Sequence, residues 1–439
     1  MPNIVKLLQA RAVVAGQILG SAILLAAAFG ALEASAAPIL ASATRTAGFL
    51  SASTVFIPVP LRDNGATSLP FATPVVNQKV VILYNAECAV AAARGTRLSI
   101  RILVDGIDAA PVSAADFSLC SAVDANAATW ASVLRQSVMT VPASGNHTLK
   151  ILARLVGASG TWRLDDSSLV VQPALAFASR TDALQSTTAA PVQLPLTENG
   201  AKLLSFATTA ANERLKITYN AECVVAASLP GERMTTSISV AGVGNSDHDN
   251  LCNSVDITGQ TWAGTARQFV LTVPAAGTHT AAVYGQLDSG PATWQIDDSS
   301  LAITRSVLAS AVNTQIISTS TTAEVPVPIM TGGATALPFT TTKNNQVVKL
   351  SYNALCAILG QRGRWLGIRL EVDGVEAAPA SGYDFALCSA VEPLKYYYTT
   401  AFRQSVITVP NAGAHNVRLY ARISDFANWY LGQQSLTVE

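Results

Sequence analysis

The sequence predicts an all-β protein, with three tandem antiparallel β-sandwiches behind an N-terminal signal peptide. Three observations predict this class. One unit recurs three times along the 439 residues, apolar and polar residues alternate within each copy, and a basic and then apolar segment precedes the first copy. The chain is also longer than most single domains.

Residues 1–36 have the order of residues that is typical of a secretory signal peptide. Lys6 and Arg11 precede an uncharged stretch over residues 12–32, and Ala-Ser-Ala at 34–36 matches a cleavage site. The alternative is an uncleaved membrane anchor, because a stretch of this length could span a bilayer. The small residues favour cleavage. We therefore expect the rest of the chain to be secreted, extracellular or periplasmic, without a membrane attachment.

The repeat is defined by landmarks that return in the same order. They are Tyr-Asn-Ala-x-Cys from Tyr84, Tyr219 and Tyr352, a second cysteine, Arg135-Gln136, Arg267-Gln268 and Arg403-Gln404, Val-Pro-x-x-Gly-x-His, and a closing Trp162, Trp294 or Trp429 before Ser-Leu. This period is too long for a solenoid, whose units cannot fold alone. We therefore expect whole domains over 37–172, 173–304 and 305–439. Their joints lack Gly/Ser tracts, so packing between the domains is expected.

The pattern within a copy is typical of strands. Residues 98–104 alternate between apolar and polar, apart from one leucine, and end at Asp105-Gly106, a pair that favours a tight turn between strands. The third copy repeats this before Asp373-Gly374. No sustained helical stripe follows the leader. We expect about eight to ten short strands per copy.

These motifs resemble secreted bacterial jelly-roll domains similar to the tumour-necrosis-factor-like group. The resemblance rests on Tyr-Asn-Ala-Glu-Cys, Val-Asp-Gly, Thr-Val-Pro-x-x-Gly-x-His and the closing Ser-Leu, and it covers each copy nearly end to end. The second copy departs from it, with Ala241-Gly242 in place of Asp-Gly. The resemblance implies a jelly-roll-like fold, trimer-like packing and no enzymatic activity.

Six cysteines fall two per copy. In an exported chain they predict one disulfide in each copy. The expected pairs are Cys88 with Cys120, Cys223 with Cys252, and Cys356 with Cys388. Zinc signatures need closely spaced Cys or His ligands, and the sequence has none, so we expect no metal.

Composition argues against several classes of function. Only 13% of the residues are charged, with 28 basic and 28 acidic side chains, and no basic cluster that would bind nucleic acid is present. The sequence has no Gly-x-Ser-x-Gly elbow, Walker loop or His-Glu-x-x-His motif. We therefore expect no cofactor, no catalytic residues and no nucleic-acid partner.

Three groups of polar residues could still carry chemistry. The recurring His147, His279 and His415 could act as bases, or hold a metal if they converge, but hydrogen-bonded residues just past a hairpin are the simpler interpretation. Asp165-Asp166 would point to opposite faces of a strand and could not flank one bond. The Asp-His-Asp segment at 247–249 could hold a cation, although a solvated loop is the simpler interpretation.

Aromatic residues are the remaining indication of binding. Trp130, Trp262 and Tyr397 follow the second cysteine of their copies and could stack on sugar rings, unless they are buried in a core or between domains. Our first expectation is a non-enzymatic structural, adhesive or assembly protein of the cell surface or extracellular matrix. The alternatives are a carbohydrate-binding protein that uses these aromatics, and an unrecognised hydrolase. The expected partner is a glycan or another surface protein.

Overall fold

A computed structural model describes residues 39–112, 117–123, 129–227, 231–255, 261–288, 290–305, 307–391 and 397–439. The signal peptide expected at 1–36 lies outside the described residues. Among those described, no helix has the length and apolar character needed to cross a membrane. Residues Ala36–Glu439 form one compact unit.

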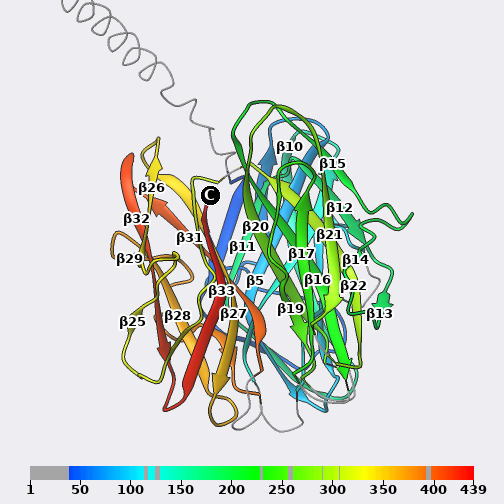
Figure 1. Ribbon diagram of the computed structural model, residues 1–439, viewed down its shortest axis with the longest axis vertical. Helices are drawn as coiled ribbons and strands as arrows, with labels where there is room; N and C mark the ends of the chain where they lie inside the picture. Colours follow the sequence, from blue (N-terminus) through cyan, green and yellow to red (C-terminus); the bar gives the residue numbers. More distant parts are fainter. Residues whose placement is uncertain are drawn as a thin grey trace, which may run out of the picture. The chain divides into compact units, whose positions relative to one another are not determined.

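Each repeat folds into two antiparallel sheets (Figure 1). The strands of the first repeat are β1 Ala41–Arg45, β2 Phe49–Ser51, β3 Ile57–Pro58, β4 Ser68–Thr73, β5 Gln78–Ala92, β6 Arg97–Val104, β7 Ile107–Asp108, β8 Ser118–Ser121, β9 Ala131–Val141, β10 Gly145–Val156 and β11 Gly160–Pro173. One sheet has the order β1-β11-β5-β9, with β2 also on β11. The other has the order β3-β10-β6-β7, with β4 on β10 and β8 on β6.

The second and third repeats have the same topology. The strands of the second are β12 Ala176–Arg180, β13 Leu184–Ser186, β14 Val192–Gln193, β15 Leu204–Thr208, β16 Glu213–Ala227, β17 Arg233–Val240, β18 Gly244–Asn245, β19 Asp249–Asn253, β20 Ala263–Val273, β21 Gly277–Leu287 and β22 Ala292–Thr304. Those of the third are β23 Ala309–Asn313, β24 Ile317–Thr319, β25 Val325–Pro326, β26 Ala336–Thr341, β27 Gln346–Leu359, β28 Trp365–Val372, β29 Val375–Glu376, β30 Ala386–Ser389, β31 Thr399–Val409, β32 Gly413–Ile423 and β33 Asn428–Val438. The predicted class, three tandem antiparallel β-sandwiches, is therefore confirmed. The described residues hold eleven strands per repeat, more than expected, because two-residue strands line the sheet edges.

A disulfide joins the two sheets of each repeat. Cys88 on β5 is bonded to Cys120 on β8, with their Cα atoms 6.3 Å apart. The other two bonds lie at the equivalent places and join Cys223 to Cys252 and Cys356 to Cys388. Each bond closes a loop that restricts the unfolded chain, a stabilisation of roughly 3.5 kcal/mol in the simple entropy model.

The central strands β5, β16 and β27 are buried along almost their whole length. Successive side chains of a strand point to opposite faces. In β5, Ile82 and Tyr84 belong to the core of their own repeat, whereas Val81 and Leu83 belong to a second cluster. This second cluster includes residues of all three repeats, Phe402 of the third among them. The outer faces of the central strands are therefore covered by neighbouring repeats.

Polar landmarks of the sequence join the repeats into a closed ring. The main-chain N–H of Gln136 donates to Asn220 Oδ1 of the second repeat at 2.9 Å, and the N–H of Gln404 donates to Asn85 Oδ1 of the first at 2.9 Å. Between the second and third repeats, the Gln268 side chain donates to the carbonyl oxygen of Ser351. Each repeat therefore contacts both of the others, and the last contacts the first.

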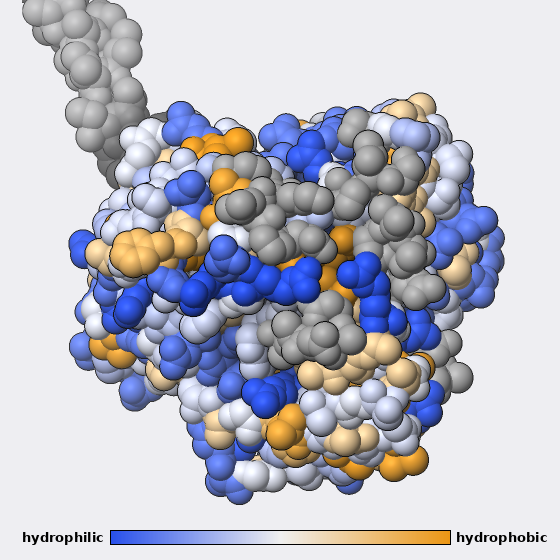
Figure 2. Space-filling view, turned by 90° about the horizontal axis from the view of Figure 1, so that it is seen from below, coloured by the Kyte–Doolittle hydropathy of each residue, from blue (hydrophilic) through white to orange (hydrophobic). Residues whose placement is uncertain are grey.

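The surface is mixed in character. On the face shown in Figure 2, hydrophilic side chains form a band across the centre and apolar side chains lie in separate patches. Large exposed apolar side chains such as Leu50, Leu203 and Phe426 come from different repeats.

Candidate functional site

An aromatic residue stands at each junction between repeats, just before the strand that faces the centre of the ring. These residues are Trp130 before β9, Trp262 before β20 and Tyr398 before β31. The preceding repeat holds each main chain in place. Ser389 donates to the Trp130 carbonyl, Ser121 to the Trp262 carbonyl, and Asn250 to the Tyr398 carbonyl. The fold thus presents three related sites with different side chains.

The junction between the third and first repeats encloses a cavity of about 490 Å³. The cavity is lined by Thr46, Glu87, Trp130, Asp165 and Asp166 of the first repeat, and by Trp365, Ser381 and Asp384 of the third. Both tryptophans are half-buried. Two indole rings and several carboxyl groups therefore surround one space.

A β-bulge brings both aspartates to this cavity. The pairing of β11 with β5 slips between Asp165 and Ser168, and Asp166 has a φ of 39°, in the left-handed region. A bulge re-aims the side chains around it. The alternation assumed from the sequence therefore fails here, and the expectation that the two carboxyl groups face apart is wrong.

Burial changes the protonation of the carboxyl groups. It raises the pKa of Glu87 to about 9, helped by the charges of Asp166 and Asp165 and opposed by the N–H of Ala386. Burial likewise raises the pKa of Asp166 to about 6, opposed by Ser381 and Arg403. At neutral pH the site therefore combines a protonated Glu87 with a mostly ionised Asp166.

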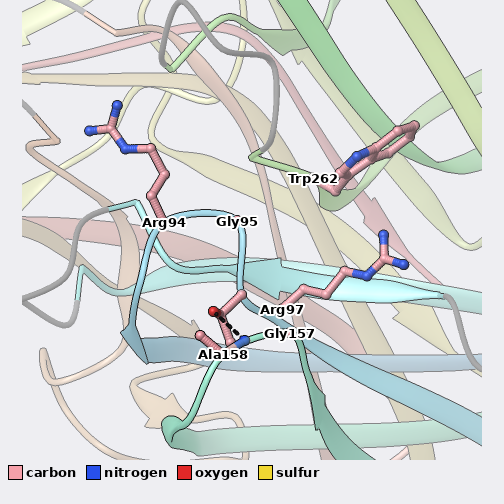
Figure 3. A pocket seen from close by; sticks show the side chains of 7 residues that line it. Arg94, Gly95, Arg97, Gly157, Ala158 and Trp262 are labelled. Carbon is pink, nitrogen blue, oxygen red and sulfur yellow. Dashed lines mark hydrogen bonds between the residues drawn. The ribbon is translucent and has the colours of Figure 1, made fainter.

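A second cavity, of about 330 Å³, lies at the junction between the first and second repeats. Arg94, Arg97 and Trp262 are its large lining side chains. Figure 3 shows Trp262 and Arg97 extending to one side and Arg94 to the other. Arg97 lies 3.7 Å from Glu222 of the second repeat. Arg97 is the first residue of β6, as Trp365 is of β28, so the same position gives an arginine here and a tryptophan at the first cavity.

The three candidate aromatic residues, Trp130, Trp262 and Tyr397, lie in different surroundings. Trp130 and Trp262 are half-buried and each lines a cavity. Tyr397 is only 7% exposed, so its ring cannot stack on a ligand, and the half-buried Tyr398 takes the equivalent place. Sequence reasoning missed Trp365, although its position at the start of a strand, where the other repeats have arginine, was a usable signal.

The buried arginine of each Arg-Gln pair faces the next repeat. Arg135 is buried, and its guanidinium carbon lies 3.6 Å from the centroid of the Phe117 ring. Burial lowers its pKa to about 10, opposed by the charges of Asp298 and Glu222 on the second repeat. Arg403 repeats this arrangement toward the first repeat.

At the junction between the second and third repeats, the buried Arg267 finds its carboxylate partner within its own repeat, because the third repeat lacks the equivalent acids. The third repeat has Leu355 and Gly-Gln at 432–433 where the others have Glu and Asp-Asp. Arg267 instead forms an ion pair with Asp249 of its own repeat. This pair accounts for one acid of the Asp-His-Asp segment at 247–249, and no group of three metal-ligating residues is found among the described residues.

Two of the three recurring histidines, His147 and His415, hold a hairpin to a turn, whereas His279 contacts Thr208 and the Ala275 carbonyl. His147 Nδ1 lies 2.7 Å from Asp105 Oδ2, and Nε2 lies 3.0 Å from Thr73 Oγ1. The Thr73 hydroxyl donates to the Ala143 carbonyl, and both Thr73 and His147 are buried. A threonine that is buried and bonded in this way cannot serve as a nucleophile. These contacts therefore stabilise the hairpin.

Replacing Asp105 by asparagine should lower the free energy of unfolding by about 1 kcal/mol at pH 7. His147, then the N–H of Thr148, lower the pKa of Asp105. A carboxylate whose pKa is depressed by folding stabilises the fold above its unfolded pKa, and this stabilisation disappears as the pH falls through the folded pKa. The loss should therefore shrink as the pH falls below 3.8, as measured by urea unfolding across pH. Asp373→Asn is the matched variant of the third repeat, and a loss that stays equal across this pH range would contradict the assignment.

No known family model matches the sequence, and no curated protein matches it. Among solved structures, the chain is similar to the tandem CBM22 domains, which are carbohydrate-binding modules, of Paenibacillus barcinonensis Xyn10C, at 13% identity and a TM-score of 0.17 over 62% of this chain and 100% of that one. It is similar to CBM35 of Cellvibrio japonicus Abf62, at 15% identity and a TM-score of 0.16 over 27% and 92%. It is also similar to the CBM6 of Zobellia galactanivorans LamC, at 22% identity and a TM-score of 0.13 over 28% and 99%.

These comparisons correct the first expectation for function. The structural, adhesive or assembly role is contradicted, because the similar solved structures are carbohydrate-binding modules, and it is not carried further. The narrower resemblance to tumour-necrosis-factor-like domains is not confirmed. A glycoside hydrolase is also among the similar structures, so the absence of enzymatic activity stays a prediction.

Proposed function

We propose that the protein binds carbohydrate without catalysis, at the cavity between its third and first repeats. The observation that carries this proposal is the pair of half-buried tryptophans, Trp130 and Trp365, from different repeats around one space. An indole ring offers a flat apolar face, and the C–H groups of a sugar ring pack well against such a face.

The polar lining supports the same ligand. Small-molecule sites are concave, enclose roughly 300 to 1,000 Å³, and combine aromatic walls with a few polar groups that fix orientation. The cavity of about 490 Å³ falls in this range. Its carboxyl groups and Ser381 supply acceptors and donors for sugar hydroxyls. We further propose that the chain acts outside the cytoplasm, where its three disulfides would persist.

Replacing Trp130 by alanine should weaken binding of the recognised oligosaccharide by roughly tenfold to a hundredfold, because the stacking surface is lost. A glycan array would find the ligand, and titration calorimetry would measure the affinity. Trp365→Ala should act similarly. Both variants should keep their thermal unfolding close to that of the parent, since both rings are only half-buried.

The matched control is Tyr284→Ala. Tyr284 is a half-buried aromatic on β21 that lines neither cavity. Its loss should leave binding unchanged. Failure of the full chain to bind any glycan, or equal affinity of the parent and Trp130→Ala proteins, would overturn the proposal.

A further inference from the structure

We propose that the cavity between the third and first repeats selects amino sugars, whose ammonium group it holds among Trp130, Trp365 and the carboxyl groups of its wall. This inference rests on the proposed function, because it names the sugar class that the same cavity takes. The experiment below separates the failure of one from the failure of the other.

The charge of the lining is one-sided. Four of the eight lining residues carry carboxyl groups, namely Glu87, Asp165, Asp166 and Asp384, and none of the eight is Lys, Arg or His. Arg403 lowers the pKa of Asp166 and Arg45 lowers that of Asp165, but neither arginine lines the cavity, and Arg403 donates to the carbonyl of Pro379. Glu87 is protonated at neutral pH and adds no charge, whereas the ionised Asp166 and its neighbours would attract a cation.

The aromatic pair adds to this attraction. A cation near the face of an indole interacts favourably with the ring, and the interaction strengthens when the site excludes water. Both indoles are half-buried and share the cavity with the carboxyl groups. A sugar that carries an ammonium group can use the ring for stacking and for this charge interaction at once.

One buried acceptor of the wall is Asp166 Oδ1. Asp166 is only 2% exposed, and this atom has no hydrogen-bond partner. A buried polar atom without a partner costs free energy. An ammonium group has three N–H donors and no acceptor, which suits a carboxylate oxygen such as Asp166 Oδ1.

A bound cation would oppose the raised pKa values of the wall carboxyl groups. Burial raises the pKa of Glu87 and of Asp166, each with help from neighbouring carboxyl groups. A bound positive charge favours the ionised form of a carboxyl group. The second cavity gives the contrast, because Arg94 and Arg97 line it and would repel an ammonium group.

The test compares two oligosaccharides with the full-length protein by titration calorimetry. One is a chitosan hexamer of glucosamine units, and the other is its fully N-acetylated, neutral counterpart. We expect the amine form to bind about tenfold more tightly. Asp384→Asn should weaken binding of the amine form about threefold or more beyond any change in binding of the neutral form.

Asp384 is exposed, so this substitution should not disturb folding. The matched control is Asp182→Asn, which removes one exposed carboxylate from the second repeat and should change neither affinity. Equal affinity for the two hexamers would overturn amine selectivity while leaving carbohydrate binding intact. Binding of neither hexamer, nor of any other glycan, would overturn both proposals. Binding of hexalysine as tight as that of the amine hexamer would show recognition of charge alone and would overturn the sugar assignment.

Discussion

Replacing Glu439 by glutamine should lower the free energy of unfolding by about 3 to 5 kcal/mol, because it leaves two buried ammonium groups without a counter-charge. Lys216 Nζ lies 2.7 Å from Glu439 Oε1, and Lys349 Nζ contacts Oε2. All three side chains are almost fully inaccessible to water. Lys349 also donates to Gln172 Oε1 at 2.6 Å, so residues of all three repeats meet at this cluster.

The pH dependence of this loss has a definite sign. Burial lowers the pKa of Lys349 to about 7, opposed by the charge of Glu439. A lysine whose pKa is lowered by folding costs stability at low pH, and this cost is relieved as the pH rises from about 7 toward the ordinary lysine value. In the Glu439→Gln protein the buried ammonium groups have no counter-charge, so the cost of their burial is relieved only when the lysines lose protons. Loss of Glu439 lowers the Lys349 pKa further, so the loss caused by the substitution should shrink as the pH rises toward about 7, where Lys349 of the parent also gives up its proton, as urea unfolding at each pH would show.

Two further variants make this prediction specific. Asp288 forms an exposed ion pair with Arg233, and Asp288→Asn should cost less than about 1 kcal/mol. Replacing Lys216, Lys349 and Glu439 together by methionine should recover stability to within about 2 kcal/mol of the parent, since apolar packing can substitute for a buried ion cluster. A Glu439→Gln protein as stable as the parent would show that the carboxylate does not neutralise the lysines.

Much of the fold could be predicted from the sequence because strands and turns depend on patterns of neighbouring residues. The alternation over 98–104 and the Asp105-Gly106 pair fix a strand and a turn, and the structure has β6 and a left-handed φ of 51° at Asp105. Strand pairing over long distances has no such local signal. The polar landmarks Asn85 and Gln136 were recognised only as repeat markers, although a buried polar pair that returns in every copy indicates a shared contact.

The candidate site was only half predictable for the same reason. Trp130 was identified from its residue type in the segment after the second cysteine, and in the structure it lines the cavity. Trp365 and Asp384 reach the cavity from another repeat, which no spacing along the chain reveals. Asp165 and Asp166 were set aside on strand alternation, and a bulge overrides that rule. Sites built between repeats therefore need the packing of the repeats to be known first.

Asn85→Ala should cost about 3 kcal/mol or more, because it breaks the contact that closes the ring between the third and first repeats. Asn85 is fully buried. Its Nδ2 donates to the carbonyls of Phe402 at 2.7 Å and Val133 at 2.8 Å, and its Oδ1 accepts the N–H of Gln404. Alanine would leave several buried main-chain groups without partners, and each such group costs about 1 to 3 kcal/mol.

The measurement can separate ring opening from general destabilisation. Hydrogen exchange at the Gln404 amide should accelerate in Asn85→Ala, whereas the amide of Gln136, which donates to Asn220 at another junction, should stay protected. Asn416→Ala is the control, because Asn416 is exposed on β32 and its loss should change stability by less than about 0.5 kcal/mol. Unchanged exchange at Gln404 would contradict a closed ring. Opening this junction should also separate Trp130 from Trp365, so Asn85→Ala should lose glycan affinity even though Asn85 does not line the cavity.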